Sequence, residues 1–223
     1  MRYLIVNGDD FGWTRGINRG ILEAHGRGIL TSTSLMVDAP GSEEAARLSR
    51  AAPDLSVGLH VVLRNGAGDP DGLADELRRQ LRRFEDLMGC LPTHLDAHHH
   101  AHRDPRLTPF FLELAALAGR PLRDHSAARV VTSFYGRWGG ETHPEQIGVE
   151  GLTRLLEAEV REGVTELCCH PGRVDPDLCS SYSFERELEL ECLCDPAVPE
   201  FLKVRGIHLV GFRGLERVQG GAP

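Results

Sequence analysis

The feature that most constrains the fold of this chain is a repeated alternation of short apolar segments with longer amphipathic segments. Short apolar segments bounded by turn residues are typical of strands that are buried on both faces. We expect strands at residues 3–7, 33–37, 56–63, 93–97, 128–132, 165–170 and 207–210. About seven such units predict an α/β fold with a barrel-like, mostly parallel sheet surrounded by helices. An open, doubly wound parallel sheet is the alternative.

Helices are expected between these strands, because apolar residues recur there every three or four positions. Thr14 is expected to cap the first helix, and Ser42 is expected to cap the second with acidic residues in its first turn. Residues 64–71 are rich in Gly, Asp and Pro and predict a linker. Later helices are expected over residues 73–87, from residue 105 onward, and over residues 152–160, 185–193 and 198–204.

Composition narrows the class of protein. The chain has 223 residues, of which 41% are apolar, so one domain over residues 1–223 is expected. The net charge of −8 and the lack of a basic run argue against nucleic-acid binding and favour neutral or cationic small substrates over phosphates. No apolar run approaches transmembrane length, and the apolar start is too short for a signal peptide, so no membrane span and a cytoplasmic location are expected.

The six cysteines are expected to be reduced thiols, because a cytoplasmic protein rarely keeps disulfides. Those that lie between residues 168 and 194 could instead form a zinc cluster. Their spacing matches no closed zinc motif, so reduced thiols are the favoured interpretation.

Titratable side chains fall at or just past the carboxyl ends of four expected strands. In α/β barrels and in open α/β sheets, this edge is where binding and catalytic sites form. One such histidine is best read as a buried polar residue, but four coincidences favour a common site. The residues concerned are Asp9 and Asp10, His60, Asp96 and His98, and His170.

Imidazole and carboxylate groups are the usual ligands of divalent metals in hydrolases. An ion held by Asp10, His60 and His98 would keep coordination positions open for water and a substrate oxygen. Asp9, the neighbour of a ligand, would then be free to act as a base. The residues therefore favour a metal-dependent hydrolase.

Five of the eleven histidines fall within residues 94–102. If the strand continued through this run, His94, Asp96, His98 and His100 would share one face. Only one or two of these histidines need be ligands. The others, including His99 and His102, are expected to support the ligands or to lie in a loop.

The motifs that carry these residues occur in a fixed order: LIVNGDDFG at 4–12, GINRGI at 16–21, GILTSTS at 28–34, GLH at 58–60, PTHLDAHHHAH at 92–102 and CHPG at 169–172. Together they resemble the YdjC-like carbohydrate deacetylases, a family that includes chitooligosaccharide deacetylase and the hopanoid-associated deacetylases. The resemblance covers nearly the whole chain. The segment between His60 and His94 is shorter than in the chitooligosaccharide branch, so chitobiose itself is not predicted as the substrate.

The resemblance implies a barrel-like fold, commonly a homodimer, and a divalent metal, most often magnesium, with zinc or another ion as an alternative. It implies that His60 and His98 bind the metal and that Asp10 completes the set. It also suggests Asp9 as general base and His170 as the group that protonates the leaving amine.

The reaction implied by the resemblance is hydrolysis of the N-acetyl group of an amino-sugar oligomer or glycolipid, giving acetate and a free amine. Two alternatives remain. One is another metal-dependent hydrolase, such as an amidase or a phosphoesterase, and the other is a non-catalytic sugar-binding protein.

The sequence says less about which residues contact the sugar. Asp96 is a candidate for substrate binding, and Arg123 is a candidate for orienting a carboxylate or a substrate oxygen. Trp138, in a Gly-rich loop, is the favoured platform for stacking on a sugar ring. Trp13 and Tyr135 are further aromatic candidates.

Overall fold

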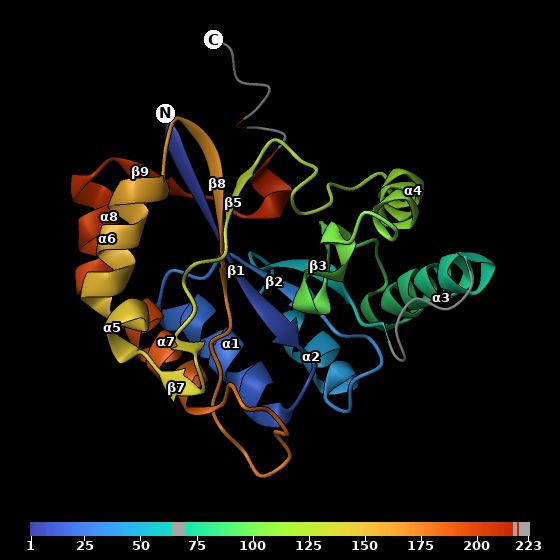
Figure 1. Ribbon diagram of the computed structural model, residues 1–223, viewed down its shortest axis with the longest axis horizontal. Coiled ribbons are helices and arrows are strands. Elements are labelled where there is room, and N and C mark those ends of the chain that lie inside the picture. Colours follow the sequence, from blue (N-terminus) through green and yellow to red (C-terminus); the bar gives the residue numbers. More distant parts are fainter. Residues whose placement is uncertain (64–69, 216–217, 219–223) are drawn as a thin grey trace.

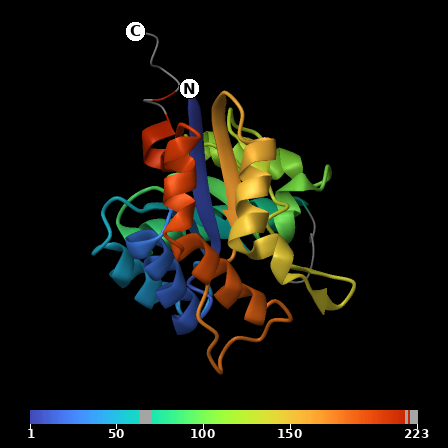
Figure 2. The same cartoon turned by 90° about the vertical axis from the view of Figure 1, so that its left-hand side faces the viewer.

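The computed structural model describes residues 1–63, 70–215 and 218. A seven-stranded sheet in the order β4-β3-β2-β1-β8-β5, with β9 also paired to β1, forms its centre, and all its pairings are parallel. Helices surround the sheet on several sides (Figures 1 and 2). The predicted barrel-like α/β fold is confirmed. The strands are β1 (Arg2–Phe11), β2 (Ser32–Leu35), β3 (Ser56–Val61), β4 (Leu95–Ala97), β5 (Arg129–Val131), β8 (Gly163–Cys169) and β9 (Ile207–Leu209).

The helices bury their apolar faces against this sheet and build one large hydrophobic core. Among the described residues, no helix combines the length and the apolar character needed to cross a membrane. The helices are α1 (Arg15–Arg27), α2 (Ser42–Ser49), α3 (Pro70–Met88), α4 (Thr108–Ala118), α5 (Pro144–Ile147), α6 (Val149–Glu159), α7 (Phe184–Cys194) and α8 (Ala197–Val204).

Several expected boundaries are confirmed and others are wrong. The Thr14 hydroxyl caps α1 by accepting the N–H of Ile17 at 3.3 Å. Ser42 does not cap α2, because the helix already begins at Ser42 and Gly41 takes the capping position. The helix expected from residue 105 begins at Thr108. Residues 64–69 of the expected linker lie outside the described residues.

A small hairpin was not predicted. Its strands, β6 (Arg137–Trp138) and β7 (Glu141–Thr142), pair antiparallel, and the short helix α5 follows them. Strands of two residues carry no readable periodicity, so the pattern could not indicate them.

Strand β1 lies at the centre of the sheet and carries both aspartates of the first motif. Its register with β2 shifts between Gly8 and Phe11, and Asp10 adopts a left-handed backbone conformation with φ of 71°. A bulge of this kind changes the direction of successive side chains. Asp9 and Asp10 therefore reach different partners.

The segment that follows β8 lies directly against α1. A Cβ atom on Gly20 would come within 2.4 Å of the Gly172 Cα atom, so only glycine permits this approach. The N–H of Arg173 donates to the Gly16 carbonyl at 3.1 Å. These contacts fix the end of β8 and with it His170.

Candidate metal and catalytic site

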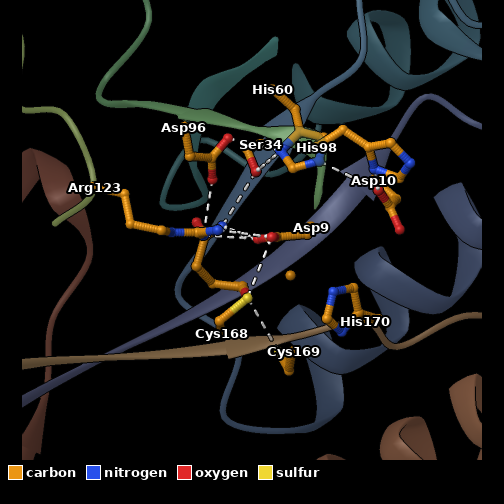
Figure 3. A network of polar contacts seen from close by, with 12 residues as sticks. Asp9, Asp10, Ser34, His60, Asp96, His98, Arg123, Cys168, Cys169 and His170 are labelled. Atoms are coloured by element: carbon orange, nitrogen blue, oxygen red, sulfur yellow. Dashed lines mark hydrogen bonds and ion pairs between the residues drawn. The ribbon is translucent and has the colours of Figure 1, made fainter. Parts of the chain in front are cut away.

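A cavity of about 450 Å³ lies at the carboxyl ends of the strands. It brings together residues from β1, β3, the end of β8, helix α7 and the turn after β4. Its lining includes Asp9, Asp10, His60, His98, His170 and Arg186. This arrangement is consistent with the prediction that these strand ends form one site, and Figure 3 shows the side chains of Asp9, Asp10, His60, His98 and His170 close to one another.

Asp10, His60 and His98 form one potential ligand set, because their ligand atoms all lie within 4.8 Å of one another. The Asp10 Oδ1 atom is 3.3 Å from His60 Nε2 and 3.2 Å from His98 Nδ1. His60 is buried, and His98 is partly open to the cavity. One carboxylate and two imidazoles are a donor set that suits a divalent metal.

The surroundings of His60 also fit a metal ligand. Its Nδ1 atom lies 2.7 Å from Asp96 Oδ1, while its buried Nε2 atom lies 3.3 Å from Asp10 Oδ1 and makes no well-aligned hydrogen bond within the described part of the chain. A carboxylate on one ring nitrogen is the usual support for an imidazole that binds metal through the other. Burial disfavours the charged ring, but Asp96 and Asp10 outweigh it and raise the pKa of His60 to about 10. This local field therefore favours positive charge at the Nε2 atom.

Arg186, from α7, holds the other oxygen of Asp10. Its guanidinium donates to Asp10 Oδ2 at 2.6 Å and to the Tyr182 carbonyl at 2.9 Å, and it lies over the ring of Trp13. Burial alone would raise the pKa of Asp10, but Arg186 and the two imidazoles hold it well below its usual range. Asp10 is therefore an ionised carboxylate with a fixed orientation.

Arg123 fixes the orientation of Asp9. Two guanidinium nitrogens donate to the two Asp9 oxygens at 2.7 Å each, and the Asn7 amide donates to Oδ1 at 2.8 Å. Burial would raise the pKa of Asp9, but the Arg123 charge and hydrogen bonds lower it well below the usual value. Asp9 is thus ionised and oriented toward the cavity that it lines.

Arg123 is 1% exposed and serves three carboxyl groups at once. Besides Asp9, its nitrogens contact Asp96 Oδ2 at 2.8 Å and Glu166 Oε1 at 2.7 Å. Burial, opposed by Arg123, raises the pKa of Glu166 to about 7. The backbone N–H of Arg123 donates to the Leu95 carbonyl at 2.9 Å, which ties this loop to β4.

His170 lines the cavity beside Asp9. Its Nδ1 atom is 3.8 Å from Glu189 Oε1, too far for a hydrogen bond, and Glu189 also accepts the hydroxyl of Tyr182. Burial favours the neutral ring, but the Glu189 carboxylate and the Asp9 charge outweigh it and raise the pKa of His170 above 6.5. This histidine therefore keeps its proton more readily than an ordinary imidazole.

The histidine run does not continue the strand. β4 ends at Ala97, residues 98–103 form a tight 3₁₀ turn, and His99 and His100 adopt left-handed backbone conformations with φ of 52° and 53°. The condition for a shared face, a strand that continues past Ala97, is therefore not met. His99 and His100 line the cavity, whereas His102 is buried with its Nε2 atom 2.9 Å from Asp124.

The expected substrate contacts lie elsewhere. Asp96 and Arg123 are buried behind Asp9 and His60, and neither is part of the cavity lining formed by the described residues. Trp138 is half exposed, stacks on His143 at 3.6 Å, and is likewise off that lining. The aromatic side chains on the lining include Trp13 and Tyr135. Contact of Asp96, Arg123 and Trp138 with substrate stays a prediction.

Sequence reasoning missed the contribution of α7. Arg186 and Glu189 are buried and hold Asp10 and the His170 segment. The segment reads FERELELECLC, in which alternating charges are typical of a solvated helix. The available signal was the spacing of three between these two residues, which places them on one face.

Comparison with known proteins agrees with these motifs. Residues 3–72 and 64–204 match the family described as YdjC-like protein. The chain is 34% identical over 242 residues to a carbohydrate deacetylase of Geobacillus stearothermophilus, with 95% of this chain and 97% of that protein covered. It is 33% identical to a chitooligosaccharide deacetylase of Serratia marcescens, with coverage of 96% and 99%.

Solved structures share the fold. A crystal structure from Enterococcus faecalis, provisionally named a cellobiose-phosphate cleavage protein, is 28% identical with a TM-score of 0.81 and covers 96% of this chain and 98% of its own. A family 4 acetyl xylan esterase from Clostridium thermocellum, solved with a cobalt ion, has a TM-score of 0.57 at 15% identity, with coverage of 99% and 93%. The second likeness concerns the fold alone.

Proposed function

The chain belongs to the family of YdjC-like proteins, and from that premise we propose that it is a metal-dependent carbohydrate deacetylase. Its reaction is hydrolysis of the N-acetyl group of an amino-sugar oligomer or glycolipid, which releases acetate and leaves a free amine. One observation carries the proposal: the ligand set of Asp10, His60 and His98 shares a single cavity with an ionised Asp9 and a proton-retaining His170. Relatives named carbohydrate deacetylases support the substrate class.

The metal would be held by Asp10, His60 and His98. Asp96 would orient His60 through its contact with the Nδ1 atom. A divalent ion supplies Lewis acidity, which polarises the acetyl carbonyl and lowers the pKa of the attacking water. Asp96 would fix the tautomer of His60 by accepting at Nδ1, which would leave the Nε2 lone pair available to hold the ion. Arg186 keeps Asp10 from turning away.

Asp9 is the proposed general base. Arg123 holds the pKa of Asp9 well below its usual range, so the carboxylate is ionised, and its place on the cavity lining lets it accept a proton from the attacking water. Its bidentate contact with Arg123 fixes the orientation of both oxygens. Holding the base in one geometry reduces the entropy cost of reaching the transition state.

His170 is the proposed general acid. An amide nitrogen must receive a proton before it can leave, and an imidazolium in the cavity can supply it. The Glu189 carboxylate and the Asp9 charge raise the pKa of His170, which favours the protonated ring that this role requires. Tyr135 lies edge-on to the His170 ring, with 6.1 Å between the ring centroids.

The pH profile provides one test of His170. The acid must be protonated, so kcat should fall as the pH rises through the pKa of His170, which lies above 6.5. In His170→Gln we expect a lower kcat, and the fall of kcat at alkaline pH that His170 causes should disappear. The loss should be larger for N-acetyl sugars than for substrates with activated leaving groups, which depart without a proton. An unchanged alkaline limb in the variant would contradict this role.

The direct test is acetate release from N-acetylglucosamine oligomers and an N-acetylglucosaminyl lipid. Metal-stripped protein should be inactive, and addition of magnesium, zinc, manganese or cobalt should restore release with at least one ion. His98→Ala should bind that ion at least about tenfold more weakly, by isothermal titration calorimetry. His208→Ala is the matched control, since this histidine is exposed and lies off the cavity lining. No acetate with any ion would refute the proposal, and hydrolysis of phosphate esters instead would favour the phosphoesterase alternative.

Four further expectations belong with this proposal. Residues 1–223 are proposed to act as one deacetylase domain, supported by the family match over residues 3–204. Magnesium as the native metal, a homodimer and a cytoplasmic location stay predictions from the sequence.

A further inference from the structure

A thiol lies beside the proposed base and acid. The Cys168 Sγ atom is 3.2 Å from Asp9 Oδ2, and the ligand atoms of Cys168, Asp9 and His170 all lie within 4.8 Å of one another. Figure 3 shows the sulfur next to Asp9, with His170 on the neighbouring side. This group shares no residue with Asp10, His60 and His98.

The strand register explains why the sulfur reaches this place. Cys168 is paired with Asn7 across the β1 and β8 strands, and Asn7 and Asp9 point to the same face of β1. Cys169 is paired with Gly8 and belongs to the hydrophobic core, where its sulfur donates to the Asn7 carbonyl. Two adjacent cysteines thus occupy opposite faces of one strand.

The ligand types of this group differ from those of the first. Sulfur, imidazole and carboxylate donors together favour zinc or cadmium, whereas magnesium rejects a thiolate ligand. An ion can enter from the cavity, which both Asp9 and His170 line. The His170 Nδ1 atom is buried and has no hydrogen-bond partner among the residues described, so the ring can turn without breaking a bond.

The local charge also admits a cation. The carboxylates of Asp9 and Asp96 both contact the guanidinium of Arg123, and the Cys168 sulfur adds a further negative charge once its proton has left. On binding, the Cys168 S–H bond breaks, its proton passes to solvent, and a sulfur–metal bond forms with no change of oxidation state.

We propose that Cys168, Asp9 and His170 form a second, inhibitory metal site for thiophilic divalent ions such as cadmium and zinc. An ion there would occupy the proposed base and the proposed acid while leaving Asp10, His60 and His98 in place. The inhibitory part rests on the proposed function, whereas binding of the ion does not.

Cadmium titration of the full chain tests the site, with Cys90→Ser and Cys179→Ser introduced to remove the two exposed thiols. We expect the ultraviolet charge-transfer band of a cadmium–thiolate bond, and inhibition of acetate release at the same cadmium concentrations. Cys168→Ser should lose the band. The cadmium concentration that inhibits its acetate release should rise at least about tenfold, with the rate of each variant compared with its own rate without cadmium. The matched variant Cys169→Ser should behave as the parent protein. Equal effects of the two variants, or no effect of Cys168→Ser, would overturn the proposal.

A second variant covers the case in which Cys168→Ser does not fold. His170→Asn keeps the thiol and removes the nitrogen ligand, so cadmium should still give the band but bind at least about tenfold more weakly. An unchanged affinity would exclude this site. Because the band is read without turnover, absence of deacetylase activity and absence of the second site give different results.

Discussion

Changing Asp9 to Asn is expected to lower kcat by about 10²–10⁴-fold while the protein still binds its divalent metal. The amide cannot accept the proton of the attacking water, but it is not one of the three side chains proposed to hold the ion. Arg123 keeps Asp96 and Glu166 as partners, so the variant should remain folded. Steady-state acetate release and calorimetric metal titration on the same preparation measure the two effects separately.

Asp96→Asn is the matched control, since Asp96 is also a buried carboxylate that accepts from Arg123. Asp96 supports His60, so its loss should weaken metal affinity by about 10–100-fold. The two variants should therefore fail in different ways. Equal loss of metal in Asp9→Asn would contradict the division of roles between Asp9 and Asp10.

Changing Arg123 to Met is expected to lower the free energy of unfolding by about 3–5 kcal/mol at neutral pH. The variant leaves Asp9, Asp96 and Glu166 buried around a side chain with no charge. This loss of stability should become smaller as the pH is lowered. Carboxyl groups without the Arg123 cation take up protons more readily, and protonation removes their buried charge. Urea unfolding followed by circular dichroism at neutral and mildly acidic pH measures the size of this loss and the direction in which it changes with pH.

Arg129→Met provides the comparison for Arg123. Arg129 pairs with Glu159 on the surface, where its side chain is 55% exposed, so its loss should cost about 0–1 kcal/mol. If the two variants were equally stable, the buried cluster around Arg123 would contribute no more than a surface ion pair. That result would also remove the structural reason for the fixed orientation of Asp9.

The positions of the strands could be predicted because buried parallel strands read as short apolar runs. The same pattern placed Asp9, Asp10, His60 and His170 at one edge of the sheet, since carboxyl ends of parallel strands meet there. What the pattern lacks is local backbone geometry. The bulge at Asp10 depends on the pairing of β1 with β2, which no short segment of sequence encodes.

The burial of charged residues was also hard to predict from the sequence. Arg123 lies outside any periodic segment, and an isolated arginine is usually exposed, so contact with substrate was the natural interpretation. Its burial follows from three carboxyl groups that come from distant parts of the chain. Arg186 and Glu189 were missed for the same reason. The burial of a charged residue can be predicted only when the residues that pair with it are known.

The placement of β1 has a consequence for how activity is lost on heating. β1 pairs with β8 along one edge and with β9 and β2 along the other. Amide protons in such a strand exchange with solvent mainly through global opening, because local fluctuation cannot release a segment bonded on both sides. Asp9 and Asp10 should therefore keep their positions in each molecule until the whole sheet comes apart, and loss of activity through these two residues should follow global unfolding.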